Sequence, residues 1–309
     1  MKLAFLYAGQ GTQHVGMGRD LYEAYPEFRA AFDGPELDFD LKALCFDGSE
    51  ERLGQTQYTQ PCMVAFAAGL TAVLAERGIR PELAAGLSLG EYSALTCAGV
   101  LDPKTAVELA AFRGRAMAQA VQGRACAMLA VLSLGRKEVA RCCREAAHLG
   151  VVEIANYNCP TQVVIAGDAA AVEQAGALAQ QAGAARVVPL RVSGPFHTSL
   201  MAPAGEALAQ RFESVTFHPM EIPVLFNCKG GPMEPGDTIP DLLVRQVRSS
   251  VYLEDTIRAM AASGVDIIVE IGPGKALSSF VRKTENGIRT FAVETAEDVD
   301  ALLDTLKGA

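Results

Sequence analysis

Gly86-Leu87-Ser88-Leu89-Gly90 follows a short apolar run, residues 83–85, and precedes a helix-like segment, residues 91–98. This order predicts a sharp turn from a strand into a helix, in which the glycines avoid side-chain clashes. The turn exposes the hydroxyl of Ser88 and places the backbone N–H of Leu89 beside it, where that N–H can stabilise an oxyanion. The pentapeptide alone is a common chance match in a chain with 29 glycines, so the prediction depends on its strand-to-helix context.

The chain has 309 residues, of which 20% are charged, and a net charge of -9 at pH 7. This length predicts two domains, or one large α/β unit with an insertion. The acidic balance argues against a nucleic-acid-binding protein, because such proteins rely on a basic surface. The N-terminal run, residues 1–7, is too short for a signal peptide and is interpreted as a first strand. No run of residues approaches the ~20 apolar positions of a membrane span.

The eight cysteines form no Cys-x-x-Cys pair, and with the four histidines they match no zinc pattern. Two of them, Cys142 and Cys143, are adjacent. Buried, reduced thiols are the interpretation that we favour, which predicts a cytoplasmic protein.

Strand-like and helix-like runs alternate along the chain, which predicts an α/β protein with a mostly parallel sheet. The middle of the chain has a β-α-β-β-α-β order that is typical of a ferredoxin-like subdomain. We therefore expect residues 1–124 and 193–309 to form one discontinuous domain around a shared sheet, and residues 125–192 to form a small inserted subdomain. Within the insertion, strands are expected at residues 127–134, 151–156, 162–166 and 186–192, and helices at residues 137–147 and 169–182.

Outside the insertion, the chain shows two further strand signals and two further helix signals. Asp102 and Pro103 are a typical N-cap and first helical residue, and they predict a helix that runs to about residue 120. The remaining signals predict strands at residues 3–8 and 265–271 and a helix at residues 275–283.

A serine hydroxyl needs a base, because it is a weak nucleophile at its free pKa. Of the four histidines, His148 and His218 are interpreted as surface residues, and His14 stays open as a candidate. His197 lies just after a strand and just before a helix, where α/β sheets place their sites. Alone it would more often be a structural hydrogen-bond partner, but together with the turn at Ser88 it is our candidate base. No acidic residue stands out as a third triad member, so a carbonyl group could orient the imidazole instead.

Arg113 lies on an apolar stripe of the predicted helix, with Leu109 and Met117. An arginine there is costly to bury unless an anion meets it, and a planar guanidinium suits a carboxylate. An internal salt bridge, or a side chain that extends to solvent, explains the position equally well. By contrast, Arg115 is interpreted as a surface residue.

Gly9-Gln10-Gly11 lacks the third glycine of a dinucleotide fingerprint, because that position is His14, and no phosphate-binding Gly-Lys-Ser/Thr follows. What remains is a tight loop at the end of a strand. This loop offers its backbone and the amide of Gln10 to a pocket.

Taken in order, these segments resemble the malonyl-CoA:acyl carrier protein transacylases of fatty acid synthesis, and they are similar to the acyltransferase domains of polyketide synthases. The resemblance implies an α/β-hydrolase-like catalytic core with a ferredoxin-like insertion. It covers almost the whole chain, with matches at residues 9–13, 86–95, 113–114, 154–158, 194–197, 244–246 and 270–275.

The resemblance also implies roles for individual residues. Ser88 would be the nucleophile that accepts the acyl group as an ester, and His197 would act as general base and then as acid. The backbone carbonyl of Gln246 would orient His197. Gln10 and the N–H of Leu89 would form the oxyanion hole.

Three further positions bear on which acyl group the site would accept. Arg113 would bind the free carboxylate of a malonyl group, and Phe196 is similar to the residue of malonyl-selective members. Leu87 departs from the family, which usually has a histidine immediately before the nucleophile, and the loop at residues 123–128 is also altered. We expect activity to survive, because the nucleophile, the base and the oxyanion donors are retained.

The implied reaction moves malonyl from coenzyme A to the phosphopantetheine thiol of an acyl carrier protein, with no cofactor or metal beyond the substrates. The alternatives are a trans-acting polyketide acyltransferase, a serine thioesterase or hydrolase, and a non-catalytic carrier-binding subunit. We expect a cytoplasmic monomer with no nucleic-acid or membrane partner. Because carrier proteins are acidic, we expect a local basic rim, with the candidates Lys275, Arg282, Lys283 and Arg191.

Overall fold

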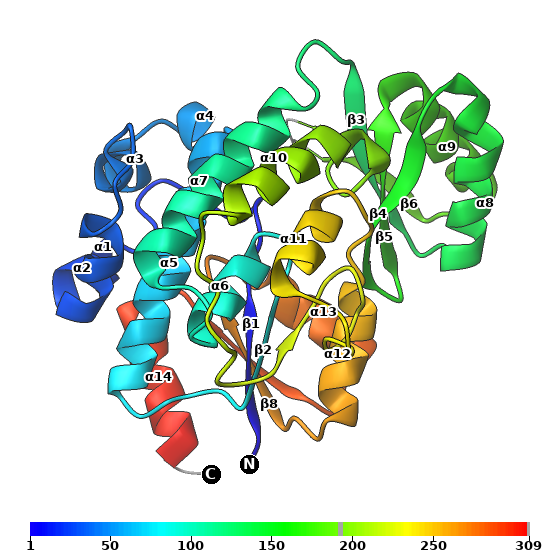
Figure 1. Cartoon of the computed structure of the whole chain (residues 1–309). Coiled ribbons are helices and arrows are strands. Elements are labelled where there is room, and N and C mark those ends of the chain that lie inside the picture. Colours follow the sequence, from blue (N-terminus) through cyan, green and yellow to red (C-terminus); the bar gives the residue numbers. More distant parts are fainter. Residues whose placement is uncertain (191–193, 308–309) are drawn as a thin grey trace. The chain divides into compact units, whose positions relative to one another are not determined.

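The structure is a computed structural model that describes residues 1–190 and 194–307 (Figure 1). It divides into two compact units, which we describe separately. The predicted insertion at residues 125–192 has different limits from either unit, so its boundaries stay a prediction. Arg191 and the end of the predicted insertion lie outside the described residues. The first unit comprises Met1–Gly114, Thr216–Leu225 and Met260–Ala309, and the second comprises Arg115–Val215 and Phe226–Ala259.

A five-stranded parallel sheet forms the centre of the first unit, in the order β7-β2-β1-β8-β9. Strands β1, β2 and β8 are buried along their full length, as is typical of apolar strands in a parallel sheet. Strands from both ends of the chain share this sheet, which confirms the prediction. The strands are β1 Leu3–Tyr7, β2 Leu83–Gly86, β7 Val224–Leu225, β8 Ile267–Ile271 and β9 Arg289–Val293.

Helices of the first unit pack around this sheet, and α6 contacts β1, β2 and α5. Two helices, α7 (Pro103–Gln119) and α12 (Leu253–Ala262), continue from one unit into the other. Asp102 accepts a hydrogen bond from the backbone N–H of Thr105 at 2.9 Å, which confirms the predicted cap of α7. The other helices are α1 Arg19–Ala24, α2 Pro26–Asp33, α3 Leu41–Asp47, α4 Glu50–Leu53, α5 Thr56–Glu76, α6 Gly90–Cys97, α13 Ala276–Thr284 and α14 Ala296–Lys307.

Helix α5 is the one helix in the described part of the chain that is long and apolar enough to cross a membrane by length and composition. The expectation that no run approaches the length of a membrane span did not single out this helix, because its first five residues, 56–60, include two threonines and two glutamines. Of its most apolar window, 78% is buried inside the protein. A buried core helix passes the same test of length and composition, so this helix is weak evidence for a membrane span.

The second unit contains a four-stranded antiparallel sheet in the order β4-β5-β3-β6. Helices α8 and α9 pack on it, and Val131, Val139 and Ile165 belong to the apolar core between them. Together with the parallel sheet of the first unit, this β-α-β-β-α-β arrangement confirms the predicted class, an α/β protein with a mostly parallel sheet and a ferredoxin-like subdomain. Its elements are β3 Cys126–Leu132, α8 Arg136–Ala146, β4 Val152–Cys159, β5 Gln162–Asp168, α9 Ala169–Gln181 and β6 Arg186–Pro189, and they are followed by α10 Ala202–Phe212 and α11 Ile239–Val247.

The segment at residues 270–275 links β8 to α13. The buried carboxylate of Glu270 accepts hydrogen bonds from the backbone N–H groups of Leu277 at 3.0 Å and Ser278 at 2.7 Å. It thereby satisfies two N–H groups that the first turn of a helix leaves without intrahelical partners. Burial raises the pKa of Glu270. We therefore assign this matched segment a structural role in starting α13.

Candidate active site

Ser88 lies on the turn between β2 and α6, where the Gly-x-Ser-x-Gly pattern predicts a strand-to-helix turn. Its φ is 53°, in the left-handed region that is strained for a residue with a side chain. A Cβ atom at Gly86 would overlap the backbone of Gly90, and one at Gly90 would overlap the carbonyl group of Tyr7. The chain can make this turn against β1 only because both positions are glycine.

Arg113 extends from α7 toward Ser88 within the first unit. Its Nη2 donates a hydrogen bond to Ser88 Oγ at 3.0 Å, and its Nη1 donates to Gln60 Oε1 at 2.9 Å. The Arg113 side chain is fully buried, so the alternative that it extends to solvent is wrong. The guanidinium also lies over the ring of Tyr92, 5.6 Å from its centroid.

Burial lowers the pKa of Arg113, while the neighbouring Tyr92 and Glu91 oppose that shift. An arginine stays cationic in a protein because its unperturbed pKa lies far above neutral pH. The site therefore presents a desolvated positive charge next to a serine hydroxyl. Such a charge attracts a carboxylate more strongly than it would in water.

Gln10 and Leu89 lie on the loops that follow β1 and β2. Tyr7 pairs with Gly86 at the ends of these parallel strands, so the two loops leave the same edge of the sheet. The Gln10 side chain is half-buried, and its Nε2 donates to Thr56 Oγ1 at 3.0 Å. Leu89 is buried immediately before the first residue of α6, at the end of the helix where its dipole favours negative charge.

His197 and Gln246 belong to the second unit. The ring Nδ1 of His197 lies 2.9 Å from the backbone carbonyl oxygen of Gln246, which is the contact that the family resemblance implies. A carbonyl oxygen can only accept, so Nδ1 carries the hydrogen, and in the neutral imidazole Nε2 then keeps a lone pair that can take a proton. His197 is 4% exposed, and its backbone N–H donates to the Val247 carbonyl at 3.2 Å. The structure therefore holds this imidazole in the tautomer that a general base needs.

Ser88 and His197 share an uncommon backbone conformation. Across the described residues, three positions other than glycine have a positive φ: Ser88 at 53°, Ser133 at 60° and His197 at 62°. Strained positions of this kind cluster at active sites. Two of the three are the predicted nucleophile and base.

The other three histidines lie at the surface. His14, left open by the sequence, is exposed, and its Nε2 lies 2.5 Å from Glu294 Oε1, a contact that raises the pKa of His14. His148 and His218 are exposed, as predicted, and so is Arg115. Across residues 1–190 and 194–307, no three His, Cys, Asp or Glu side chains gather closely enough to hold a metal ion.

The basic candidates on α13 and immediately before it are also at the surface. Lys275, Arg282 and Lys283 are exposed, and Arg282 donates to Thr290 Oγ1 at 2.9 Å. Their exposure is compatible with an acidic partner. Their role as a docking rim stays a prediction.

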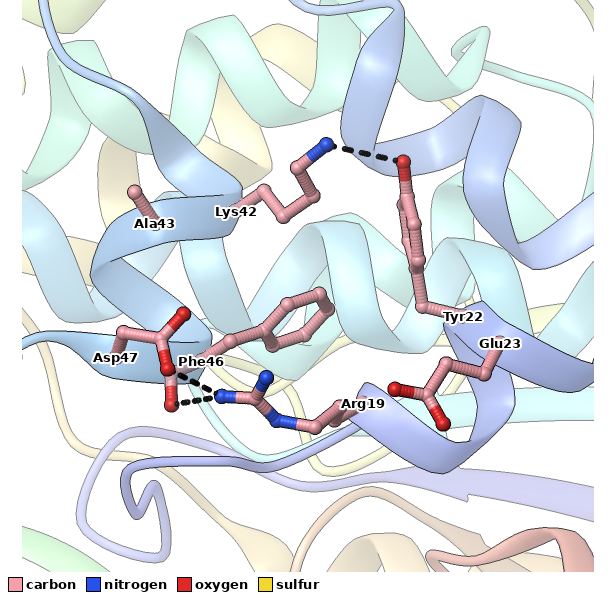
Figure 2. A pocket seen from close by; sticks show the side chains of 7 residues that line it. All are labelled: Arg19, Tyr22, Glu23, Lys42, Ala43, Phe46 and Asp47. Carbon is pink, nitrogen blue, oxygen red and sulfur yellow. Dashed lines mark hydrogen bonds and ion pairs between the residues drawn. The ribbon is translucent and has the colours of Figure 1, made fainter.

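A surface pocket of about 330 Å³ lies between α1 and α3, away from the predicted site residues (Figure 2). Its charged groups are engaged with their neighbours: Arg19 bonds Asp47 at 2.5 Å, and Lys42 donates to the hydroxyl of Tyr22 at 3.2 Å. Figure 2 shows the ring of Phe46 between these two contacts. We assign this pocket no catalytic role.

Gln60 is a site residue that the sequence did not single out. It lies on α5, is 1% exposed, and accepts a hydrogen bond from Arg113. A polar residue followed by Pro61, directly before the apolar residues 62–70, was the available signal. That signal does not say which partner the side chain meets.

The chain matches the family described as acyl transferase domain over residues 4–301. A malonyl CoA-acyl carrier protein transacylase from Bacillus subtilis (strain 168) is 39% identical over 309 residues, which are 99% of this chain and 98% of the relative. The solved structure of MCAT from Streptococcus pneumoniae is 43% identical with a TM-score of 0.93, and the match covers 98% of this chain and 100% of that chain. The malonyl-transacylase PlMCAT, solved in complex with the type II PKS acyl-carrier protein AntF, is 38% identical with a TM-score of 0.95, over 99% and 100% of the two chains.

The chain belongs to the acyl transferase domain family and is an acyltransferase. Its similarity to malonyl CoA-acyl carrier protein transacylases over almost its full length confirms the resemblance predicted from the sequence.

Proposed function

We propose that this chain transfers malonyl from malonyl-CoA to the phosphopantetheine thiol of an acyl carrier protein, through an ester on Ser88. The observation that best supports it is the 3.0 Å contact between Arg113 Nη2 and Ser88 Oγ. In a malonyl ester, one CH₂ group separates the ester carbonyl from the free carboxylate. A carboxylate so close to Ser88 Oγ lies within reach of the guanidinium, which can bind it with two hydrogen bonds.

The proposed reaction has two halves. Nε2 of His197 takes the proton of Ser88, and Oγ attacks the thioester carbonyl carbon. The carbon–sulfur bond breaks, and the coenzyme A thiol leaves with the proton from His197. The phosphopantetheine thiol then gives its proton to His197 and attacks the ester, which releases Ser88 as a hydroxyl. The N–H of Leu89 and the amide of Gln10 stabilise the oxyanion in both halves.

The test is to mix the protein with malonyl-CoA and measure its intact mass, then add holo acyl carrier protein. We expect a covalent malonyl adduct that disappears as malonyl carrier protein forms. Free malonate as the main product would identify a hydrolase, and the absence of any adduct would identify a non-catalytic carrier-binding protein.

The proposed oxyanion donor has its own test. Gln10→Ala should lower the rate of malonyl transfer by about 10²- to 10³-fold if the Gln10 side chain is an oxyanion donor.

The acceptor has a second candidate, because one relative was solved with a type II PKS acyl-carrier protein. Transfer rates to a fatty-acid carrier protein and to a polyketide carrier protein separate the two.

Lys283→Glu should weaken binding of the carrier protein, and most strongly at low salt. The same change at Lys307, which is exposed on α14, should not weaken it.

We also propose a cytoplasmic monomer that needs no cofactor beyond its substrates. The location is supported by the eight cysteines, which are all free thiols, six of them buried. Sedimentation of the purified protein tests the monomer.

A further inference from the structure

Gln60 joins the two parts of the candidate site that lie in the first unit. Its Oε1 accepts from Arg113 Nη1 at 2.9 Å, and its Nε2 donates to Gln10 Oε1 at 3.5 Å. Gln10 in turn donates from Nε2 to Thr56 Oγ1 at 3.0 Å. A continuous line of buried or half-buried side chains thus runs from the guanidinium to the loop after β1.

The guanidinium determines the direction of every hydrogen bond in this line. Arginine only donates, so Gln60 must present its carbonyl oxygen to Arg113 and its NH₂ group to the other side. Gln10 must then present its own carbonyl oxygen to Gln60, which turns its NH₂ group toward Thr56. The same Gln60 amide therefore orients both Arg113 and the amide of Gln10.

Close packing of α7 on α5 keeps the side chains of Gln60 and Arg113 next to each other. A Cβ atom at Gly114 would lie 2.7 Å from the carbonyl oxygen of Thr56 and 2.8 Å from the Cα of Gln57. Because position 114 has no side chain, α7 can approach the start of α5 this closely. The approach brings the guanidinium within hydrogen-bond reach of Gln60.

From these contacts we infer that Gln60 is a positioning residue that determines the preference for acyl groups with a free carboxylate. A neutral amide aligns the guanidinium and leaves its positive charge for the substrate. A glutamate of nearly the same shape would instead form an ion pair with Arg113 and compete with the substrate carboxylate. This inference rests on the proposed function, in which Arg113 binds the malonyl carboxylate.

The experiment compares Gln60→Glu and Gln57→Glu, which add the same charge to the same helix. Only the first position belongs to the line of hydrogen bonds. Initial rates of carrier acylation are measured with malonyl-CoA and with acetyl-CoA. For Gln60→Glu we expect the KM for malonyl-CoA to rise by about 10²-fold with kcat changed less than about tenfold, because the lost interaction is made in the ground state and the transition state alike. Because Gln60→Glu also loses the hydrogen bond to Gln10, kcat for acetyl transfer should fall by the same factor as kcat for malonyl transfer, while the KM for acetyl-CoA should stay within about threefold of that of the unmodified enzyme. Both activities of Gln57→Glu should stay within about threefold of those of the unmodified enzyme.

A general structural role of Gln60 predicts equal losses of kcat/KM for malonyl and acetyl groups. That result, or an unchanged KM for malonyl-CoA, would overturn the inference. If thermal unfolding shows that Gln60→Glu does not fold, Gln60→Asn takes its place. Its shorter amide cannot reach Arg113 and Gln10 together, so the same selective rise in KM is expected, and equal losses overturn the inference here too. The unmodified enzyme separates the two levels: if it forms no malonyl adduct, the proposed function itself is wrong. If the unmodified enzyme forms the adduct and Gln60→Glu has the same KM for malonyl-CoA as the unmodified enzyme, only the role of Gln60 is wrong.

Discussion

The guanidinium of Arg113 contacts the hydroxyl of Ser88, with Nη2 donating to Oγ at 3.0 Å. The two residues are 25 positions apart and come from α7 and from the turn before α6. The contact brings a buried cation to the oxygen atom that would hold the acyl group. It therefore links the candidate nucleophile directly to the group that would select an acidic substrate.

Replacing Arg113 with alanine should separate carboxylate recognition from acyl chemistry. Arg113→Ala should lower kcat/KM for malonyl-CoA by about 10²-fold or more, because a buried charge partner of the carboxylate is lost. Acetyl transfer should fall far less. Steady-state rates with both thioesters measure the difference, and Arg115→Ala, at an exposed position two residues along the chain, is the matched control. Equal losses for both acyl groups would assign Arg113 a purely structural role.

Replacing Ser88 with alanine should abolish the malonyl adduct in an intact-mass experiment. Transfer should fall by about 10⁴- to 10⁶-fold, as for other enzymes that lose their nucleophile. Ser93→Ala, at a buried serine on α6, should keep the adduct. An adduct that persists in Ser88→Ala would show that another group is acylated.

Replacing Gly114 with alanine should disturb the packing of α7 on α5. The added Cβ atom meets backbone atoms of Thr56 and Gln57 at 2.7 and 2.8 Å, which cannot move aside as a flexible side chain can. We expect the free energy of unfolding to fall by about 1–3 kcal/mol, as for other overpacked positions. Urea denaturation measures it. Gly287→Ala, where an added Cβ atom has no neighbour within 4 Å, should show a much smaller change.

Substitutions at Tyr92 test whether its ring or its hydroxyl contributes to stability beside the guanidinium of Arg113. Its hydroxyl is buried and has no hydrogen-bond partner among the residues that the structure describes. Tyr92→Phe should leave the free energy of unfolding unchanged or raise it by about 1 kcal/mol, because no hydrogen bond is lost and no polar group stays buried. Tyr92→Leu should lower it by about 1–3 kcal/mol through lost packing and lost cation–π contact. A clear loss of stability in Tyr92→Phe would contradict this account.

The contact between His14 and Glu294 should make stability depend on pH. Glu294 raises the pKa of His14 in the folded protein, so this contribution is fully present below the unfolded pKa of about 6.5 and is lost as pH rises through the higher folded value. His14→Gln should therefore destabilise the protein more at about pH 5.5 than at about pH 8.5. The effect should be at most about 1 kcal/mol, because the His14 side chain is 50% exposed. His148→Gln, at an exposed histidine whose ring contacts a backbone carbonyl, is the control, and a larger effect at high pH would refute the assignment.

Much of the site was predictable because its signals are local. The glycines on either side of Ser88 report a turn that side chains would block, and the position of His197 between a strand and a helix places it in a loop. The contact between His197 and the Gln246 carbonyl was implied only by the family resemblance, since the partner is a backbone atom 49 residues away. The role of Gln60 was not predicted, because a single buried amide carries no periodic signal that names its partner.

The sequence by itself determined the alternation of strands and helices, the βαββαβ order of the second unit and the turn at Ser88. Periodicity and steric limits act over a few neighbouring residues, so they can be interpreted without knowing what packs against them. Only the tertiary structure decided that Arg113 is fully buried, and that its guanidinium lies between Gln60 and Ser88. The partners of a buried polar group depend on which distant elements pack together, and the close approach of α7 to α5 at Gly114 brings Arg113 to Gln60.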